Sequence, residues 1–154
     1  MHKLACGCPG SQVRTLKSNT TNKGTDKGKK RESQLRQWPT QLHLVPTNAP
    51  YLQDAHLLLA ADCVPFAYAD FHRDFIQDRV VLNACPKLDD TSPYVEKLTR
   101  IIQDNNIRSL TVTIMEVPCC RGMALFAQKA LEQAGKDIPL EIVIIGVNGE
   151  RKSA

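Results

Sequence analysis

The sequence predicts an α/β fold in which a small, open, mostly parallel sheet of four to five strands carries helices on its faces. Three observations support this class. Continuous apolar runs of strand length recur along the chain, segments of helical period separate them, and the two alternate through its second half. Strands that are apolar on both faces are typical of parallel sheets, because helices cover both faces of such sheets.

The expected strands are short runs that end at turn-forming residues. Four of them are continuously apolar, at residues 55–62 (AHLLLAAD), 79–84 (RVVLNA), 109–117 (SLTVTIMEV) and 140–147 (LEIVIIGV). Residues 41–45 (QLHLV) alternate apolar and polar positions, which predicts a further, half-buried strand that stops before a proline. With helices between them, these strands predict a Rossmann-like three-layer arrangement.

Three helical segments are expected between the strands. Residues 66–77 are expected to form one helix, and three phenylalanines are among its apolar positions: Phe66, Phe71 and Phe75. The second helix is expected to take Ser92 as its N-cap and Pro93 as its first residue. The third, within residues 122–136, has an apolar stripe and ends at Gly135, a natural C-terminal cap.

Charge divides the chain into two parts. Residues 1–40 carry nine lysines and arginines against two acids, whereas residues 41–154 carry eleven against fourteen. Residues 11–32 are polar and nearly free of large hydrophobic side chains, so they cannot bury enough surface to offset the entropy of ordering. We therefore expect residues 1–40 to form a Cys-x-Cys segment and a flexible basic linker, and residues 41–154 to form the α/β domain. The basic cluster at 27–31 is a weak signal, and nucleic-acid binding is not expected.

The apolar runs also bear on location. None is long enough to cross a bilayer, and the first residues lack the apolar stretch of a signal peptide. We expect a cytoplasmic protein without a membrane association. Because structural disulfides are rare in the reducing cytosol, the six cysteines of the chain indicate metal binding, redox chemistry or catalysis.

Four cysteines directly follow predicted strands. Cys63 follows the first continuous apolar strand, Cys85 follows the second, and Cys119 and Cys120 follow the third. The carboxyl ends of parallel strands meet at one edge, with neighbours about 4.8 Å apart, so we expect these thiols to lie together. A single cysteine at a strand end is usually a small buried hydrophobe, whereas four at equivalent positions are typical of a site. Each loop leads into a helix whose N-terminus should lower the thiol pKa, and thiolate is the form that binds metal. We predict these four residues as metal ligands.

Further side chains are candidates around these ligands. Cys6 and Cys8 are possible additional ligands, or they are exposed thiols of a frayed terminus. Lys87 and Arg121 are expected to offset the negative charge of a metal cluster. His72 is expected either to face solvent on its helix or to reach the cysteines. The Glu116 carboxylate is expected to lie next to the cysteine ligands and to support them through hydrogen bonds.

Three longer motifs resemble a known family. QLRQWPTQLHLVPTNAPYLQDAHLLLAADCVPFAYADFHRDF, ACPKLDD and EVPCCRG are similar to the C-terminal region of 4Fe-4S ferredoxin-type iron–sulfur proteins of anaerobes. In that group a ferredoxin domain with two C-x₂-C-x₂-C-x₃-C-P runs precedes a GCPG segment and this region. The similarity spans residues 5–149, but this chain contains no such run, so the ligands of the ferredoxin domain do not carry over. The resemblance implies an accessory domain in a low-potential redox setting.

The sequence predicts an iron–sulfur protein, with a 4Fe-4S cluster favoured, that transfers electrons or senses redox state. Zinc is one alternative, in a structural or adaptor domain, although structural zinc usually takes C-x₂₋₄-C pairs and the cysteine spacings here are 22, 34 and 1. A metal-free thiol redox protein is another, with Cys119 attacking a disulfide and Cys63 or Cys85 resolving it. A redox protein partner is expected. An electron-transfer or accessory role is expected in preference to a stand-alone enzyme. A hydrolase in particular is not expected, because no G-x-S-x-G run is present.

Overall fold

The main sheet of the protein has five strands in the order β4-β3-β5-β6-β7. They come from a computed structural model that describes residues 12–16 and 30–153. Strands β3 to β6 pair in parallel, and β7 pairs antiparallel with β6. The predicted open, mostly parallel sheet is therefore confirmed. The strand bounds are His56–Ala61 for β3, Val80–Ala84 for β4, Ser109–Met115 for β5, Leu140–Ile145 for β6 and Arg151–Lys152 for β7.

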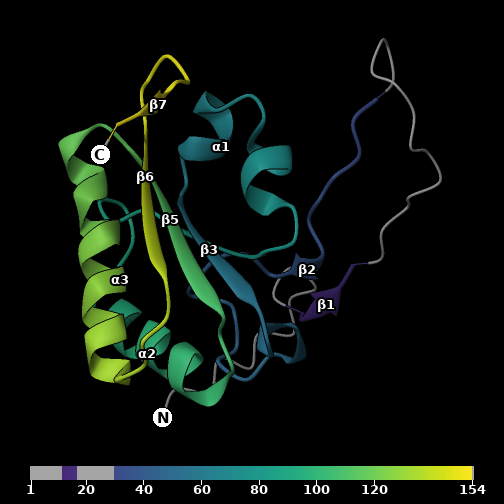
Figure 1. Cartoon of the computed structure of the whole chain (residues 1–154), viewed down its shortest axis with the longest axis vertical. Helices are drawn as coiled ribbons and strands as arrows, with labels where there is room; N and C mark the ends of the chain where they lie inside the picture. Colours follow the sequence, from purple (N-terminus) through teal and green to yellow (C-terminus); the bar gives the residue numbers. More distant parts are fainter. Residues whose placement is uncertain (1–11, 17–29, 154) are drawn as a thin grey trace.

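Helices cover both faces of this sheet and give the predicted three layers. On one face, α2 (Tyr94–Asp104) and α3 (Arg121–Ala134) pack against each other (Figure 1). On the other face lie α1 (Val64–Ala67) and the π-helix η3 (His72–Ile76) (Figure 1). The described residues also contain two short 3₁₀ turns, η2 (Pro50–Leu52) and η4 (Pro118–Cys120). No described helix is long and apolar enough to cross a membrane.

The central strand β3 explains why the apolar runs are continuous. Leu57, Leu58 and Leu59 are each 0% exposed. Successive side chains of a strand point to opposite faces, so the burial of three in a row requires cover on both. Leu98, Ile101 and Ile102 of α2 are also 0% exposed and belong to the same hydrophobic core. Each such side chain contributes on the order of 2 kcal/mol by leaving water.

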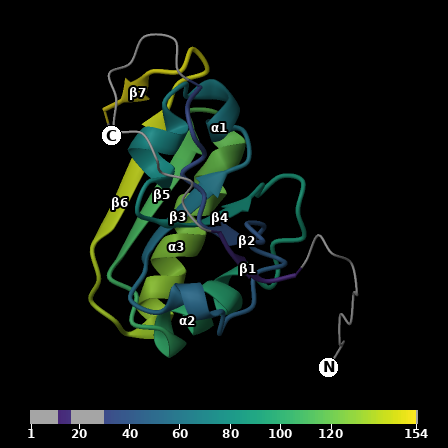
Figure 2. The ribbon, with the colours of Figure 1, turned by 90° about the vertical axis from the view of Figure 1, so that its right-hand side faces the viewer.

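Residues 30–40 run along the sheet at its β4 edge (Figure 2). In this stretch β2 (Gln37–Trp38) pairs antiparallel with β1 (Arg14–Thr15) in a separate two-stranded sheet. The Gln37 side-chain amide donates a hydrogen bond of 2.7 Å to the Val81 carbonyl of β4. The end of the expected basic linker is thus packed against the α/β domain. Cys6, Cys8 and residues 17–29 lie outside the described residues.

The predicted strand at residues 41–45 is wrong. Gln41 makes one parallel bridge to Asn83, and the chain then turns, with the backbone N–H groups of Leu44 and Val45 both donating to the Gln41 carbonyl. Leu42 and Val45 are buried, whereas Leu44 is 43% exposed. The buried positions therefore follow the three-residue spacing of a turn and not the two-residue spacing of a strand.

The predicted single helix at residues 66–77 is divided. α1 ends at Ala67, Tyr68 has an extended backbone, and η3 then closes with a hydrogen bond from the Gln77 N–H to the His72 carbonyl. The division leaves Phe66 93% exposed, while the other two phenylalanines of the segment are buried.

The predicted start of α2 is wrong, whereas the predicted end of α3 is correct. α2 begins at Tyr94 and not at Pro93, which occupies the N-cap position. Ser92 lies outside the helix, where its hydroxyl donates a hydrogen bond of 2.7 Å to Asp90. Gly135 is confirmed as the C-cap of α3, in the left-handed conformation with φ of 64° that favours glycine.

Candidate functional site

Four cysteines lie where three adjacent parallel strands end. β3 lies between β4 and β5 in the sheet. Cys63 comes two residues after β3, Cys85 directly follows β4, and η4, which contains Cys119 and Cys120, follows β5. The strand order therefore brings the three cysteine loops side by side at the carboxyl edge of the sheet. We call these four residues the cysteine edge.

The loops that carry Cys63 and Cys85 are tight turns. Cys63 is exposed at the N-cap of α1, and its carbonyl accepts hydrogen bonds of 3.2 Å from the Phe66 and Ala67 N–H groups. Cys85 is half-buried, and its N–H donates to the Asp89 carboxylate at 2.8 Å. The Asp89 N–H donates in return to the Cys85 carbonyl at 3.0 Å. Asp89 therefore closes the Cys85 loop from both sides.

The vicinal pair in η4 is asymmetric. Cys119 is exposed, whereas Cys120 is buried at 6% exposure. Burial raises the pKa of the Cys120 thiol, a hydrogen bond with the Met115 backbone lowers it, and the neighbouring thiols of Cys119 and Cys63 raise it further. Three of the four thiols therefore lie within electrostatic reach of one another. The expectation that a helix N-terminus would lower the thiol pKa is wrong for Cys120, because desolvation outweighs the helix dipole there.

A close backbone contact joins the Cys85 loop to the vicinal pair. Gly122 lies in the first turn of α3, directly after Cys120 and Arg121. A Cβ atom at Gly122 would lie only 3.1 Å from Cβ of Pro86. The absence of that atom lets the Cys85 loop rest against the start of α3, so the second and third cysteine loops touch.

Half-buried polar side chains support the same edge, and the sequence analysis missed these contacts. Asp62 accepts a hydrogen bond of 2.6 Å from the Asn83 amide, which ties the end of β3 to β4. Asp89 accepts a hydrogen bond from the Tyr94 hydroxyl in addition to that from the Cys85 backbone. Burial, the Asp89 hydrogen bond and nearby negative charge, including that of Cys85, raise the pKa of Tyr94. An aspartate four residues after a cysteine is a turn signal, and it could have identified this contact.

The predicted supporting residues differ in what they contact. Lys87 and Arg121 are both exposed, each next to a cysteine loop. Glu116 accepts a hydrogen bond of 2.9 Å from the Val147 N–H and pairs with Lys152, whose hydrogen bond lowers the Glu116 pKa. Glu116 therefore fastens the β6–β7 hairpin to the end of β5.

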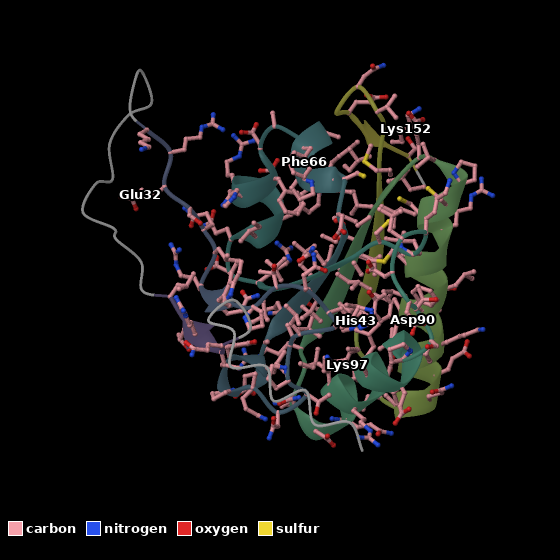
Figure 3. All side chains as sticks on the ribbon, turned by 180° about the vertical axis from the view of Figure 1, so that it is seen from behind. Glu32, His43, Phe66, Asp90, Lys97 and Lys152 are labelled. Atoms are coloured by element: carbon pink, nitrogen blue, oxygen red, sulfur yellow. The ribbon has the colours of Figure 1, made fainter. Side chains whose placement is uncertain are left out.

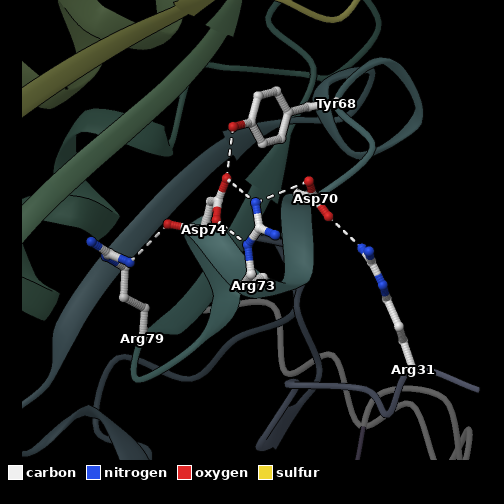
Figure 4. Close-up of polar contacts among 6 residues, drawn as sticks. All are labelled: Arg31, Tyr68, Asp70, Arg73, Asp74 and Arg79. Atoms are coloured by element: carbon white, nitrogen blue, oxygen red, sulfur yellow. Dashed lines mark hydrogen bonds and ion pairs between the residues drawn. The ribbon is translucent and has the colours of Figure 1, made fainter. Parts of the chain in front are cut away.

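His72 is exposed on η3, where its Nδ1 accepts a hydrogen bond of 3.1 Å from the Gln34 N–H. Around it, a polar network fixes η3 (Figure 4). Asp70 pairs with Arg31 and with Arg73, and Arg73 pairs with Asp74 at 2.7 Å. These contacts join His72 to the segment that leads into the sheet, on the exposed side of η3.

Exposed apolar side chains surround the cysteine edge. Phe66, which follows β3, is 93% exposed; Leu88, which follows β4, is 84% exposed; and Val147, which follows β6, is 61% exposed. Figure 3 shows the sulfur atoms of the described residues gathered toward the end of the molecule where Phe66 and Lys152 are labelled. Exposed apolar side chains therefore lie in the same loops, after the ends of the strands, as the exposed thiols of Cys63 and Cys119.

Within residues 12–16 and 30–153, no three His, Cys, Asp or Glu side chains converge as ligands of one metal ion. Zinc requires such convergence, since its sulfur ligands all lie about 2.3 Å from one atom. An iron–sulfur cluster needs less, because each thiolate binds a different iron. The structure provides four free cysteines at the ends of adjacent strands.

The comparisons with known proteins agree with the fold. An uncharacterized protein of Archaeoglobus fulgidus is 34% identical to the chain over 116 residues, which cover 75% of this chain and 81% of that protein. No solved structure matches the chain. Residues 49–153 match the family described as a Rossmann-like domain, and this stretch contains the whole five-stranded sheet and all four residues of the cysteine edge. The chain therefore belongs to the Rossmann-like domain family.

Proposed function

We propose that the protein binds an iron–sulfur cluster, of the 4Fe-4S type, at the cysteine edge and that it transfers electrons or senses redox state. The observation that carries this proposal is the strand order β4-β3-β5, which gathers the loops of four free cysteines at one end of the sheet. The electrostatic coupling of Cys120 to Cys119 and Cys63 supports it, because it requires these thiols to be neighbours.

In this proposal each residue has a separate task. Cys63, Cys85, Cys119 and Cys120 hold the group, which when bound supplies one-electron exchange. Cys120 releases its proton on binding, and because burial raises its pKa, loading becomes more favourable as pH rises. The exposed cations Lys87 and Arg121 offset the charge of the thiolates. Asp89 keeps the Cys85 loop closed through its hydrogen bonds to that backbone.

The surroundings of the edge support a redox protein as the partner. Electron transfer requires close approach, and Phe66 and Leu88 offer exposed apolar contact surface beside the thiols. Interfaces of this kind bury apolar side chains at their centre and place charges at the rim. We place the protein in the cytoplasm, where a reducing milieu keeps unligated cysteines free.

Anaerobic purification followed by absorption spectroscopy and analysis of iron, sulfide and zinc tests the proposal. We expect a thiolate-to-iron absorption band in the visible region and about four irons per chain. The single variants Cys63→Ser, Cys85→Ser, Cys119→Ser and Cys120→Ser should each lose iron while keeping a wild-type circular dichroism spectrum. The double variant Cys6→Ser/Cys8→Ser decides whether these two possible additional ligands belong to the site: unchanged iron limits the ligands to the cysteine edge, and loss of iron adds them. Unchanged iron content in the Cys63 and Cys85 variants would contradict the proposal.

A metal-free thiol redox protein is the second candidate, and one contact favours it. Cys119 and Cys120 are adjacent, and the Cys119 thiol contributes to the raised pKa of the Cys120 thiol, so the two thiols influence each other. In that role the exposed Cys119 would attack a substrate disulfide as thiolate, and Cys63 would displace the mixed disulfide, so that two protein thiols are oxidised and the substrate is reduced. Protein without metal that reduces a disulfide would support this candidate, and stoichiometric zinc would instead indicate a structural or adaptor domain.

A further inference from the structure

The sheet brings three cysteine loops to one edge, but it pairs only two of them up to their cysteines. The parallel pairing of β3 with β4 continues to Ala84, the residue before Cys85. The pairing of β3 with β5 ends at Thr113, inside β5, whereas Cys119 lies in η4 beyond the end of that strand. A further contact is needed to fix the vicinal pair relative to Cys63.

The β6–β7 hairpin contacts the loops on both sides of this gap, and its turn lies next to α1 (Figure 1 and Figure 2). On the side of the vicinal pair, Glu116 accepts a hydrogen bond of 2.9 Å from the Val147 N–H. On the side of Cys63, a Cβ atom at Gly149 would lie only 2.5 Å from the carbonyl oxygen of Ala67, the last residue of α1. The hairpin therefore bridges the first and third cysteine loops.

Both contacts reach the cysteines through a short path along the chain. The Ala67 N–H donates a hydrogen bond of 3.2 Å to the Cys63 carbonyl, so a shift of Ala67 also moves Cys63. Glu116 is separated from the vicinal pair by Val117 and Pro118, and the proline ring restricts that backbone. The two bridged loops carry interacting thiols, because the charge of Cys63 contributes to the raised pKa of the Cys120 thiol.

Other contacts keep the hairpin in its place. The Arg151 guanidinium lies 4.7 Å from the centre of the Phe75 ring, below α1 in the same layer. Lys152 pairs with the Glu116 carboxylate, which also binds the Val147 N–H. Gly149 has a φ of 88°, and glycine is the residue that combines this conformation with a close approach of two backbones. The hairpin is thus attached to the end of β5, to α1 and to η3.

We infer that the β6–β7 hairpin fixes the spacing between Cys63 and the vicinal pair, and that Gly149 and Glu116 are positioning residues of the cysteine edge. As far as it concerns cluster binding, this inference rests on the proposed function, because a cluster requires its thiolates at matched positions. The spacing between Cys63 and Cys85 does not depend on the hairpin, since β3 and β4 are paired up to their ends.

Thiol–disulfide exchange in metal-free, full-length protein measures the two spacings. One background keeps Cys63 and Cys120, the other keeps Cys63 and Cys85, and serine replaces the other cysteines in each. The exposed Cys63 thiolate attacks oxidised glutathione and releases one glutathione, and the second cysteine then displaces the other. Two protein thiols are oxidised and one glutathione disulfide is reduced. The ratio of oxidised to reduced protein in a glutathione buffer gives the effective concentration of the two thiols.

The hairpin variants should affect one thiol pair and spare the other. Gly149→Ala should lower the effective concentration of the Cys63–Cys120 pair by about tenfold. The Cys63–Cys85 pair should change by less than about twofold. Glu116→Ala should act in the same way, whereas Glu116→Gln keeps an acceptor for the hairpin N–H and should restore most of the effective concentration.

Gly135→Ala is the matched control for Gly149→Ala. It also places an alanine at a positive φ, of 64°, but no other described part of the chain lies within 4 Å of the new Cβ. Neither thiol pair should change in this variant. The inference is overturned if Gly149→Ala leaves the Cys63–Cys120 pair unchanged, or if both pairs weaken equally in the hairpin variants.

The iron content of the chain with all its cysteines separates this inference from the proposed function. Where wild type takes up iron, Gly149→Ala and Glu116→Ala should contain less by about twofold or more, and Gly135→Ala should match wild type. Unchanged iron in both hairpin variants would overturn the role of the hairpin in cluster binding. A wild type without iron would refute the proposed cluster, and the glutathione measurement would then decide the role of the hairpin by itself.

Discussion

The backbone N–H of Cys85 donates a hydrogen bond of 2.8 Å to the side chain of Asp89. The same carboxylate oxygen accepts a hydrogen bond from the hydroxyl group of the fully buried Tyr94. A single aspartate thus joins a cysteine loop to the core beneath α2. The position of the Cys85 thiol consequently depends on a residue that would not itself touch a metal.

Removal of this carboxylate should destabilise the fold. Asp89→Ala leaves the buried Tyr94 hydroxyl and the Cys85 N–H without an acceptor, so we expect the free energy of unfolding to fall by about 2–3 kcal/mol. Urea denaturation measures this loss. Tyr94→Phe is the matched control, since it removes the hydroxyl and leaves the Asp89 contact with Cys85 intact. Equal stability of Asp89→Ala and wild type would show that the hydrogen bonds of Asp89 do not stabilise the fold.

The four thiols should differ in reactivity in protein freed of metal. Cys63 and Cys119 are exposed, whereas burial raises the pKa of Cys120 and shields its sulfur. Because the thiolate is the reactive form, iodoacetamide near neutral pH should label Cys63 and Cys119 first and Cys120 last. Mass spectrometry of peptides at successive times gives the order. Protein unfolded in urea is the control, in which all four thiols should be labelled at one rate. Early labelling of Cys120 in the folded protein would contradict the prediction.

The contribution of Asp74 to the stability of the protein should be lost at acidic pH. Hydrogen bonds from Arg73 and then from Tyr68 hold the Asp74 pKa at about 2, below its ordinary value of 3.8 (Figure 4). The ionised form is favoured in the folded state, so its contribution is complete above the ordinary pKa and is lost as pH falls toward 2.

The comparison of Asp74→Asn with wild type tests this dependence. Asp74→Asn should lower the Tm at neutral pH, and the difference should shrink as the pH is lowered through that window. Asp137→Asn, a substitution at an exposed position outside the network, should shift the Tm little at any pH. A difference for Asp74→Asn that stays constant down to the lowest pH would mean that the charge of Asp74 does not stabilise the fold.

The close approach at Gly122 should matter for cluster loading. In Gly122→Ala the new Cβ would lie 3.1 Å from Pro86, so the Cys85 loop must move away from the start of α3. We expect a loss of about 1 kcal/mol in stability together with a lower iron content per chain. Gly135→Ala at the other end of α3 strains a left-handed C-cap and should cost about the same, with iron unchanged. Parallel loss of iron in both variants would assign the effect to general destabilisation.

The sequence was sufficient to predict the sheet because burial on both faces leaves an unambiguous pattern. Leu57 to Leu59 form a continuous apolar run, and a parallel central strand is the structure that buries all three. The placement of the cysteine loops at one edge followed from the same reasoning, since a strand that ends in the sheet delivers its next residues to that edge.

Other features depend on contacts between distant segments, which local patterns do not contain. The helix expected at 66–77 is interrupted at Tyr68, whose hydroxyl bonds to Asp74. Glu116 meets Lys152 only because β7 folds back on β6. The raised pKa of Cys120 likewise results from tertiary burial, which overrides the effect expected from its place before a helix. The apolar spacing at residues 41–45 was compatible with both a strand and a turn, and the bridge at Gln41 decided between them.

Cys63, Cys85 and the vicinal pair follow three neighbouring strands, so their relative positions depend on the sheet and not on the lengths of the connections between the strands. The distances between the loops are set by hydrogen-bonded strand pairs, and the helical crossovers between the strands do not set them. A crossover can therefore grow or shrink at its solvent-facing turns while the thiols keep their relative places. A change in the spacing of these cysteines along the chain would therefore leave the thiols together, whereas a change in their register at the ends of the strands would separate them.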